Sequence, residues 1–467
     1  MSNLESFLSP RSIAVIGASR DRKKPGNLIL RNIVEGGFAG DVYPVNPAGG
    51  EIEGLQTYGT VEEIPAEVDM AVIVVARAHV EKAMHQCVGA GVRSAVVVTA
   101  GFGEGDEMGR ETQQRLRELA QGAGMVAIGP NTIGYVNAEA RLFASFVRFP
   151  EWRNGSVALV AQTGIYAGAV VHELMARPFQ KLGIKVSVDV GNRIALSDHD
   201  LIEPLVSDDD IKVLGFYIEE FDEGDTFLAK AAQAKQDKPI IVLKSGRTGQ
   251  GARASMAHTG SRTGDEEAND RMLREHGLVR AEDNAEFVSF LTTFAYCPVP
   301  AGRRVGVVTF SGALGIMATD ALVDAGMEIA DFAQSTLDAL DELAPDWQAI
   351  GNPADLWSAA EADPAKAAQR LYHAVLEDPN VDQMLFVLLA LPNVDHDGMR
   401  EVFEDLRHRR PEVPIHVTLD GALRGAWAAR LEGLGIVVHD SVRTAARAMN
   451  ALSTYAEYRE AAQGLAG

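Results

Sequence analysis

The sequence predicts an α/β protein made of doubly wound parallel sheets. Short apolar segments rich in Val, Ile and Ala alternate with amphipathic helical segments almost throughout its 467 residues. Continuously apolar strands separated by helices are typical of parallel sheets that are covered on both faces. At roughly 150 residues per domain, a chain of this length holds about three domains. We therefore expect three α/β domains in succession.

The first domain is expected at 1–148, where helical segments separate five predicted strands. These strands are Ser12–Ile16, Val42–Val45, Met70–Val75, Ser94–Thr99 and Met125–Ile128. Two Pro-containing breaks, Phe149–Gly155 and Cys297–Gly302, set the limits of a second domain at 149–298 and a third at 299–467. The strands predicted in these domains are Val157–Val160, Lys185–Val188, Val213–Ile218, Ile240–Lys244, Val305–Thr309, Gln383–Leu389, Ile415–Thr418 and Ile436–Val438.

The second and third domains begin alike. Val157–Gly168 (VALVAQTGIYAG) and Val305–Ile316 (VGVVTFSGALGI) each contain a strand, a Thr-Gly or Ser-Gly turn and the start of a helix. The matched glycines, Gly164 and Gly312, are 148 residues apart. This repeat predicts two related domains of one fold. The alternative is an unrelated pair, because strand–turn–helix units are common.

Composition excludes several classes of protein. The chain has 43 Lys and Arg against 65 Asp and Glu, a formal charge of −22, whereas nucleic-acid binding requires basic surface. No apolar run approaches the roughly 18 residues of a membrane span, and the N-terminus lacks the features of a signal peptide. The two cysteines, Cys87 and Cys297, lack metal-type spacing. We expect a cytoplasmic protein that binds neither nucleic acid nor membrane.

A first candidate site follows the first strand. Gly17-Ala18-Ser19 opens toward a helix, where free N–H groups can bind a phosphate. The NAD fingerprint requires a second glycine and an acidic residue after the second strand, but Ser19 and Val45-Asn46-Pro47 occupy those positions. Lys23 and Lys24 add positive charge, which suits a nucleotide with an extra phosphate, such as CoA. The alternative is a structural turn in which glycine permits close packing.

A second candidate site is His258. It lies among small, polar and Gly-rich residues that follow the strand ending at Lys244, and long Gly-rich loops in compact domains are usually functional. Lone histidines are nonetheless common, and the sequence has 11.

Two other histidines lie between aspartates, in Asp198-His199-Asp200 and Asp395-His396-Asp397. Each of these motifs lacks a second cluster of ligands, so we predict solvated turns there rather than metal sites.

Motifs along nearly the whole chain resemble the ADP-forming (NDP-forming) acyl-CoA synthetases, relatives of succinyl-CoA synthetase, and specifically their α-subunit-type segment. In chain order they are IAVIGAS, VYPVNP (Val42–Pro47), GFGEG (Gly101–Gly105), GPNTIG (Gly129–Gly134), QTG (Gln162–Gly164), VGN (Val190–Asn192), YIEE (Tyr217–Glu220), KSGR (Lys244–Arg247), AHTGSRTG (Ala257–Gly264), SGALGIMATD (Ser311–Asp320) and NPADL (Asn352–Leu356). The resemblance implies an N-terminal Rossmann-like CoA-binding domain followed by two flavodoxin-like doubly wound domains. The sequence departs from the family pattern at Thr132, where many relatives have cysteine, and at Phe310 and Ala313-Leu314, which leaves the acyl group open.

The resemblance also implies a reaction. A carboxylic acid, ATP and CoA interconvert with acyl-CoA, ADP and phosphate through an acyl phosphate and a phosphohistidine. The phosphoryl group is expected on His258, with Glu219 orienting the ring and Glu220 as the alternative. The implied phosphate-binding residues are Gln162, Thr163, Gly164 and Gly260, and the implied CoA-binding residues are Gly17, Ala18, Ser19, Lys24, Val45, Asn46, Pro47 and Asn131. An imidazole that is uncharged near neutral pH can accept a phosphoryl group.

Nothing in the chain resembles an ATP-grasp module or an acetyltransferase. We therefore expect a separate ATP-grasp β-type subunit that binds ATP or ADP and Mg²⁺, in a heterotetramer, and no metal site on this chain. One alternative is a catalytically inactive CoA-binding regulatory or scaffold protein, which would need neither His258 nor Glu219. Another is an NAD-linked dehydrogenase, which the missing fingerprint disfavours.

Overall fold

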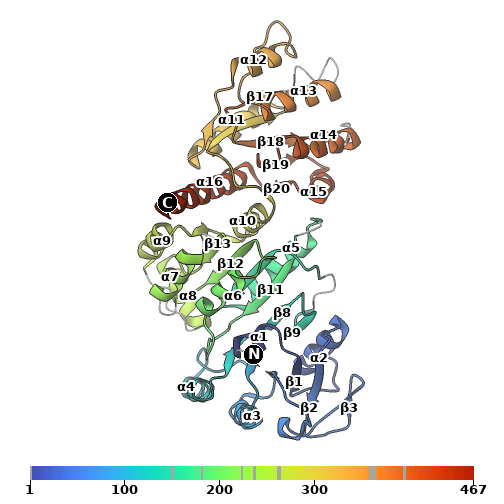
Figure 1. The fold of residues 1–467 in the computed structure, drawn as a ribbon, viewed down its shortest axis with the longest axis vertical. Coiled ribbons are helices and arrows are strands. Elements are labelled where there is room, and N and C mark those ends of the chain that lie inside the picture. The colour runs from blue at the N-terminus through green and yellow to red at the C-terminus, as the bar shows by residue number, and fades with distance from the viewer. Residues whose placement is uncertain are drawn as a thin grey trace. The chain divides into compact units, whose positions relative to one another are not determined.

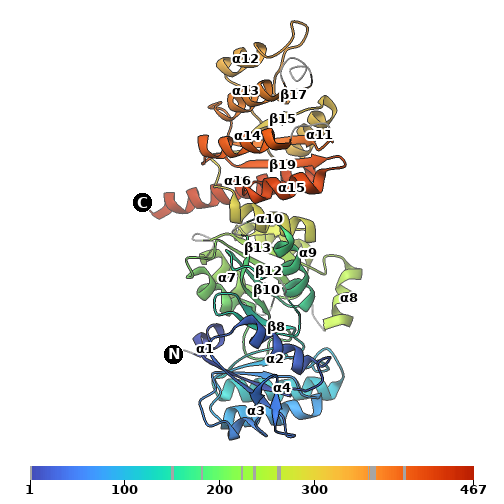
Figure 2. The ribbon, with the colours of Figure 1, turned by 90° about the vertical axis from the view of Figure 1, so that its right-hand side faces the viewer.

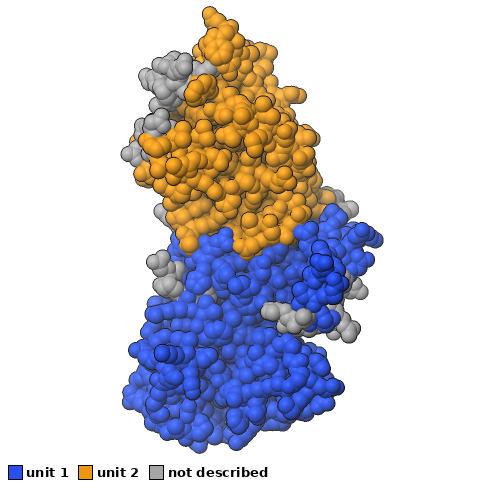
Figure 3. All heavy atoms as spheres, turned by 180° about the vertical axis from the view of Figure 1, so that it is seen from behind, with its two compact units in different colours: residues 1–175, 183–280 blue, residues 176–182, 281–467 orange. Residues whose placement is uncertain are grey.

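The computed structural model describes residues 3–148, 152–179, 182–221, 224–234, 238–259, 265–355, 357, 364–392 and 396–466. The chain divides into two compact units, which Figure 3 shows in blue and orange. Unit 1 contains residues 1–175 and 183–280, and unit 2 contains residues 176–182 and 281–467.

Unit 1 begins with a five-stranded parallel sheet in the order β2-β1-β5-β6-β7. Its strands are β1 (Ser12–Ile16), β2 (Asp41–Val45), β5 (Met70–Ile73), β6 (Ser94–Val97) and β7 (Val126–Ile128). The other elements are α1 (Asn3–Leu8), α2 (Pro25–Gly36), β3 (Glu51–Ile52), β4 (Leu55–Gln56), the 3₁₀ helix η1 (Val61–Glu63), α3 (Arg77–Gly89) and α4 (Glu107–Gly122). Successive strand residues, such as Ala14 and Val15, enter different core clusters. Both faces of the sheet are therefore covered, as its apolar strands require.

Unit 1 also contains a seven-stranded sheet in the order β14-β13-β12-β10-β11-β8-β9. Its strands are β8 (Gly134–Asn137), β9 (Leu142–Ser145), β10 (Val157–Ala161), β11 (Ile184–Asp189), β12 (Val213–Ile218), β13 (Ile240–Lys244) and β14 (Val279–Ala281). Its helices are the π-helix η2 (Tyr166–Val170), α5 (Val171–Ala176), the 3₁₀ helix η3 (Asp198–Leu201), α6 (Ile202–Val206), α7 (Gly224–Ala234), α8 (Gly249–Thr259) and α9 (Glu266–Glu275). We call this sheet the middle sheet.

Unit 2 is built on a sheet in the order β16-β15-β18-β19-β20, with β17 paired to β15. Its strands are β15 (Arg304–Thr309), β16 (Glu328–Ile329), β17 (Ala354–Asp355), β18 (Gln383–Leu389), β19 (Ile415–Asp420) and β20 (Val437–His439). Its helices are α10 (Asn284–Tyr296), α11 (Gly312–Asp324), α12 (Gln334–Asp341), α13 (Pro364–Leu376), α14 (His396–Arg409), α15 (Arg424–Gly433) and α16 (Val442–Ala466). Helices cover both faces of this sheet (Figure 1 and Figure 2), and Leu385 and Phe386 enter different cores.

The three sheets repeat one strand order. Apart from the small β3–β4 hairpin and the added β8, β9 and β17, each sheet has the order 2-1-3-4-5 of flavodoxin-like folds. In this order the second and third strands lie on opposite sides of the first strand. A crevice therefore opens between the first and third strands at their carboxyl ends, a position called the switch point. The predicted fold class and the repeat marked by Gly164 and Gly312 are confirmed. The domain limits at 148/149 and 298/299 stay predictions.

Several local expectations were wrong. The Gly-rich segment after Lys244 contains helix α8 rather than a continuous loop. The Thr248 hydroxyl accepts a hydrogen bond from Gly251 N at 3.0 Å and caps this helix, and the Ala, Arg and Met residues that follow are strong helix formers. The hairpin β8–β9, which pairs with β11 of the middle sheet, was not expected, and neither were the short strands β14, β16 and β17.

Among the described residues, no helix combines the length and apolar character that a membrane crossing demands.

Candidate active site

The first candidate site lies at the carboxyl ends of β1 and β2. Gly17 has a φ of 96°, and a Cβ at this position would lie 2.6 Å from the Val74 carbonyl oxygen, so only glycine fits. Gly17 N donates to the Val45 carbonyl at 3.0 Å, and Asn46 Nδ2 donates to the Ala18 carbonyl at 2.7 Å. The structure therefore brings Gly17, Ala18, Val45 and Asn46 together.

Three further predicted CoA-binding residues flank this corner. The Ser19 carbonyl accepts a hydrogen bond from Asn27 Nδ2 at 2.8 Å. Lys24 is the exposed N-cap residue of α2, and Pro47 is exposed in the loop after β2. A helix N-terminus next to an exposed ammonium group favours an anion, so these residues fit a phosphorylated nucleotide such as CoA.

Asn131 lies elsewhere, in the Gly129–Gly134 loop that follows the edge strand β7, with β5 and β6 between it and the Gly17 corner. This loop is tied to the end of β11 in the middle sheet. The Thr132 hydroxyl donates to the Asp189 carbonyl oxygen at 2.6 Å, and Asp189 Oδ2 accepts from Ile133 N at 2.7 Å. Burial raises the pKa of the Asp189 carboxyl to about 7. Asn131 is thus near the strand ends of the middle sheet.

The second candidate site lies at the switch point of the middle sheet. Gln162 directly follows β10, and Glu219 and Glu220 directly follow the neighbouring β12. Gln162 Oε1 accepts hydrogen bonds from Glu219 N at 2.8 Å and from Glu220 N at 3.0 Å. Gln162 Nε2 donates to the Glu220 carbonyl at 2.9 Å and to Asp198 Oδ2 at 2.8 Å. Because a side-chain amide has two donors and one oxygen with two lone pairs, these four bonds use its full capacity.

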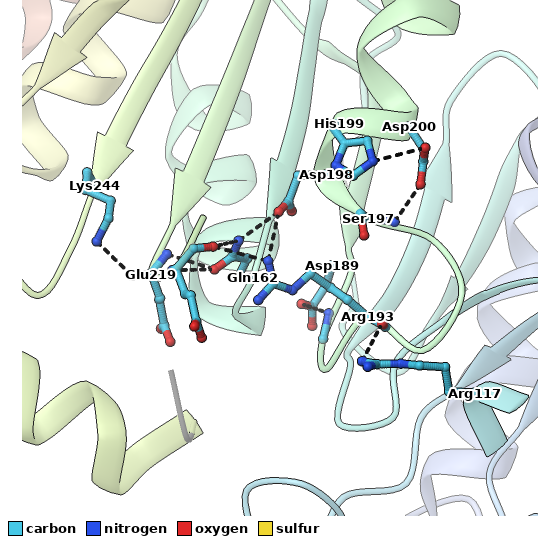
Figure 4. Close-up of polar contacts among 12 residues, drawn as sticks. Arg117, Gln162, Asp189, Arg193, Ser197, Asp198, His199, Asp200, Glu219 and Lys244 are labelled. Atoms are coloured by element: carbon cyan, nitrogen blue, oxygen red, sulfur yellow. Dashed lines mark hydrogen bonds and ion pairs between the residues drawn. The ribbon is translucent and has the colours of Figure 1, made fainter. Parts of the chain in front are cut away.

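Arg193 and Asp198 support this network (Figure 4). Arg193 Nη1 donates to the Glu220 carbonyl at 3.1 Å and to Asp198 Oδ2 at 3.3 Å. Asp198 is 4% exposed, and burial raises the pKa of its carboxyl although Arg193 and Gln162 act to lower it. The predicted solvated turn is therefore wrong for Asp198, which is buried and bonded by Gln162 and Arg193.

Lys244 supports the other side of the Glu219–Glu220 turn. It ends β13 with a side chain that is 1% exposed, and its Nζ donates to the carbonyl oxygens of Glu219 and Ser245, both at 2.7 Å. Burial lowers the pKa of the Lys244 ammonium group to about 8. Glu219 itself is 5% exposed, and the Tyr217 hydroxyl donates to its Oε1 at 3.4 Å. A nearly buried carboxylate is therefore held at the strand end.

The helical segment after β10 starts at the same corner. A Cβ on Gly164 would lie 2.3 Å from Ile133 Cγ2, so close packing requires glycine there. The first N–H groups of a helix lack partners within it and carry partial positive charge, and Thr163 and Gly164 occupy this position. Tyr166, in the π-helix η2, stacks on Tyr217 with ring centroids 3.8 Å apart. Such π-helical turns often occur at functional sites. The corner thus combines a buried carboxylate with amides able to bind an anion.

His258 lies near the C-terminal end of α8. Its side chain is outside the described part of the structure, as are Gly260 and the side chains of 395–397. The roles predicted for His258 and Gly260 therefore stay predictions. Within the described residues, no group of three or more His, Cys, Asp or Glu side chains could hold a metal ion.

Sequence analysis gave no site role to four residues of this region: Asp189, Arg193, Asp198 and Lys244. Asp189 and Lys244 each are the last residue of a buried strand, and all four strand residues before Lys244 are apolar. A charge at that position points to the edge of the sheet where ligands bind, so this signal could have identified both. Arg193 and Asp198 precede and begin the short helix η3 and carry no comparable signal.

Three family models match the chain. A CoA binding domain matches residues 11–138, a succinyl-CoA ligase like flavodoxin domain matches 154–294, and a Ligase-CoA domain matches 305–458. The Gly17 corner lies in the first match, and the corner formed by Gln162 and Glu219 lies in the second.

Relatives match over most of the chain. The ADP-forming acetate–CoA ligase II of Archaeoglobus fulgidus is 34% identical over 460 residues, which cover 98% of this chain and 68% of the relative. The α subunit of the ADP-forming acetate–CoA ligase II of Pyrococcus furiosus is 32% identical, with 96% of this chain and 97% of the relative covered. A solved structure of the dinucleotide-forming acetyl-coenzyme A synthetase 1 of Ca. Korarchaeum cryptofilum, in complex with phosphate and ADP, has a TM-score of 0.91 at 31% identity and covers 100% of both chains. The chain therefore belongs to the ADP-forming acyl-CoA synthetases, as an α-type chain of these CoA-binding acid–thiol ligases.

Proposed function

We propose that the chain interconverts acyl-CoA and a carboxylic acid through an acyl phosphate and a phosphohistidine at His258. In the direction of ATP formation, a phosphate oxygen attacks the thioester carbonyl carbon, the C–S bond breaks and CoA leaves as the protonated thiol. An imidazole nitrogen of His258 then attacks the phosphorus, the bond between phosphorus and the acyl oxygen breaks, and the carboxylate leaves. ADP finally takes the phosphoryl group from His258.

The buried Glu219 carboxylate at the switch point of the middle sheet carries this proposal. A histidine that accepts a phosphoryl group must keep one ring nitrogen free while the other is held. Glu219 provides an acceptor for that second nitrogen, and the helix N-terminus at Thr163 and Gly164 favours the negative phosphoryl group. Glu220 is half-buried and is the alternative orienting group.

An α-type chain implies a partner subunit, and we propose an ATP-grasp β-type subunit that binds ATP or ADP with Mg²⁺, in a heterotetramer. Two Pyrococcus furiosus relatives are α subunits by name, and this chain covers only 68% of the longer Archaeoglobus relative. CoA is expected at the Gly17 corner. Relatives are named for acetate, 4-hydroxybutyrate and trans-ferulate, so the substrate is a small carboxylic acid whose identity is open.

The phosphoryl carrier can be tested by intact mass under alkaline conditions, in which phosphohistidine survives. The chain would be purified with its ATP-grasp partner and incubated with Mg²⁺ and ATP, or with phosphate, CoA and a panel of acyl-CoAs. We expect a gain of one phosphoryl group that is lost in His258→Ala. The matched control, His276→Ala, removes a histidine whose Nδ1 contacts the Met272 carbonyl at 2.8 Å and should keep the gain. Bound CoA without any phosphorylation would contradict the proposal.

A further inference from the structure

The Glu219–Glu220 turn lies just beyond the hydrogen-bonded ladder of the middle sheet. The pairing of β12 with β13 ends at Ile218 and Lys244, so no strand supplies partners for the next peptide groups in this ladder. Both amides and both carbonyls of the turn are nevertheless paired. Their partners are the side chains of Gln162, Lys244 and Arg193. Hydrogen bonds from side chains, rather than from a neighbouring strand, therefore hold this turn in place.

Gln162 makes the largest contribution to this support. It accepts from both amides of the turn, donates to the Glu220 carbonyl and is anchored by its bond to the buried Asp198. Its side chain is 6% exposed, and its own backbone N–H donates to the Tyr217 carbonyl at 3.2 Å. Since neither its amide group nor its backbone N–H has capacity left, a bond to phosphate would require release of the turn.

We propose that Gln162 is a positioning residue that holds the Glu219 carboxylate in place through the backbone of the turn, and that it is not a ligand of the phosphate. This inference rests on the proposed role of Glu219. It also reassigns Gln162, which the family resemblance had placed among the phosphate-binding residues. Displacing a reacting group by about 1 Å can lower a rate about 10²-fold, so loss of this support should affect turnover more than substrate binding.

A double-mutant cycle between Gln162 and Glu219 tests the proposal. The chain with its partner subunit would be assayed for CoA release from acetyl-CoA, or from the acyl-CoA that best supports phosphorylation. Mg²⁺ and saturating ADP would be present to accept the phosphoryl group, while inorganic phosphate is varied. We expect Gln162→Ala to lower kcat about 10²-fold with KM for phosphate changed by less than about threefold. In a Glu219→Gln background, Gln162→Ala should cost less than about threefold more, because residues that act as a unit are not additive.

Each other outcome overturns the inference in a recognisable way. An increase of about tenfold or more in KM for phosphate with kcat unchanged would identify a phosphate ligand. Fully additive losses would show that Gln162 acts independently of Glu219 and would leave the proposed function intact. Full activity of Glu219→Gln would overturn the proposed function and this inference together.

Two further variants separate positioning from general loss of structure. Gln383→Ala in β18 removes a glutamine that is 0% exposed and donates to the Ser453 hydroxyl at 2.8 Å. This matched control should lose thermal stability without a change in kcat or KM. If Gln162→Ala fails to fold, Gln162→Met, which keeps the length of the side chain and removes its hydrogen bonds, should show the same fall in kcat.

Discussion

The corners after β10 and β15 occupy the same place in two sheets of one topology, yet their side chains differ. After β10, the Gln162 side chain holds the turn that contains buried Glu219, which follows β12. After β15, the matching residue is Phe310, which packs against the core of unit 2, and the neighbouring β18 is followed by Ala390. The topology provides a crevice in both sheets, but in the described part of the chain the polar pair on which the proposed phosphoryl chemistry depends follows β10 and β12, not β15 and β18.

A pair of buried histidines in unit 2 lies on other strands. His416 Nδ1 and His439 Nε2 are 2.9 Å apart, and His439 Nδ1 is 2.8 Å from the Ser289 hydroxyl. These histidines belong to β19 and β20, the fourth and fifth strands, rather than to the switch point. Burial lowers the pKa of His416 to about 3 and also lowers the pKa of His439. This network therefore bears on the stability of unit 2 rather than on a site.

The largest expected effect separates Glu219 from its neighbour. Glu219→Gln should lower turnover about 10²–10⁴-fold, because it removes the charge that is proposed to hold the imidazole. A loss of this size is the usual contribution of a general acid or base. Glu220→Gln should cost less than about tenfold, since the amide and carbonyl that Glu220 contributes to the network are kept in this variant. Steady-state turnover of both variants checks this. A larger loss in Glu220→Gln would transfer the orienting role to Glu220.

The next effect concerns Lys244. Lys244→Met keeps a buried aliphatic side chain but removes the ammonium group and its two hydrogen bonds. Turnover should fall about tenfold, because the Glu219 carbonyl loses its partner. Lys185→Met is the control, because Lys185 is also buried but bonds Asp208 and Asp210; its turnover should stay within about twofold. Equal losses in both variants would contradict a specific role for Lys244.

The same lysine predicts a pH dependence of stability. Its pKa falls from 10.5 to about 8 on folding, so between these values the unfolded chain binds more protons than the folded chain. Stability of the wild type should then rise with pH across this window, by up to about 1.4 kcal/mol per pH unit. Urea unfolding of wild type and Lys244→Met at several pH values measures this, and parallel curves would refute it.

The last prediction concerns the stability of unit 2. Burial lowers the pKa of His416 and His439 below 6.5. As the pH falls below 6.5, the unfolded chain therefore binds more protons than the folded chain. Stability should then be lost toward acid pH, by about 1.4 kcal/mol per pH unit for each histidine. His416→Gln should reduce this slope, while His408→Gln, at an exposed position, should not. Unfolding by urea between pH 7 and about pH 5 tests this, and an unchanged slope in His416→Gln would count against it.

Long apolar strands were predictable from sequence. Val213–Ile218, Ile240–Lys244 and Gln383–Leu389 were predicted with the observed limits, because continuous burial on both faces leaves a continuous apolar pattern. The short strands β14, β16 and β17 were not predictable. Strands of two or three residues have little pattern of their own and form because a neighbouring strand supplies hydrogen bonds.

The sequence by itself therefore determined the α/β class, the repeated fold, the family and the positions of Gly17, Gln162 and Glu219 at strand ends, since these depend on local patterns. Only the tertiary structure decided that Gln162 bonds the turn 57 residues later and Asp198 36 residues later. Contacts at such separations depend on which strands become neighbours and on where each strand ends. The strand order 2-1-3-4-5, rather than any local pattern, sets the first strand beside the third.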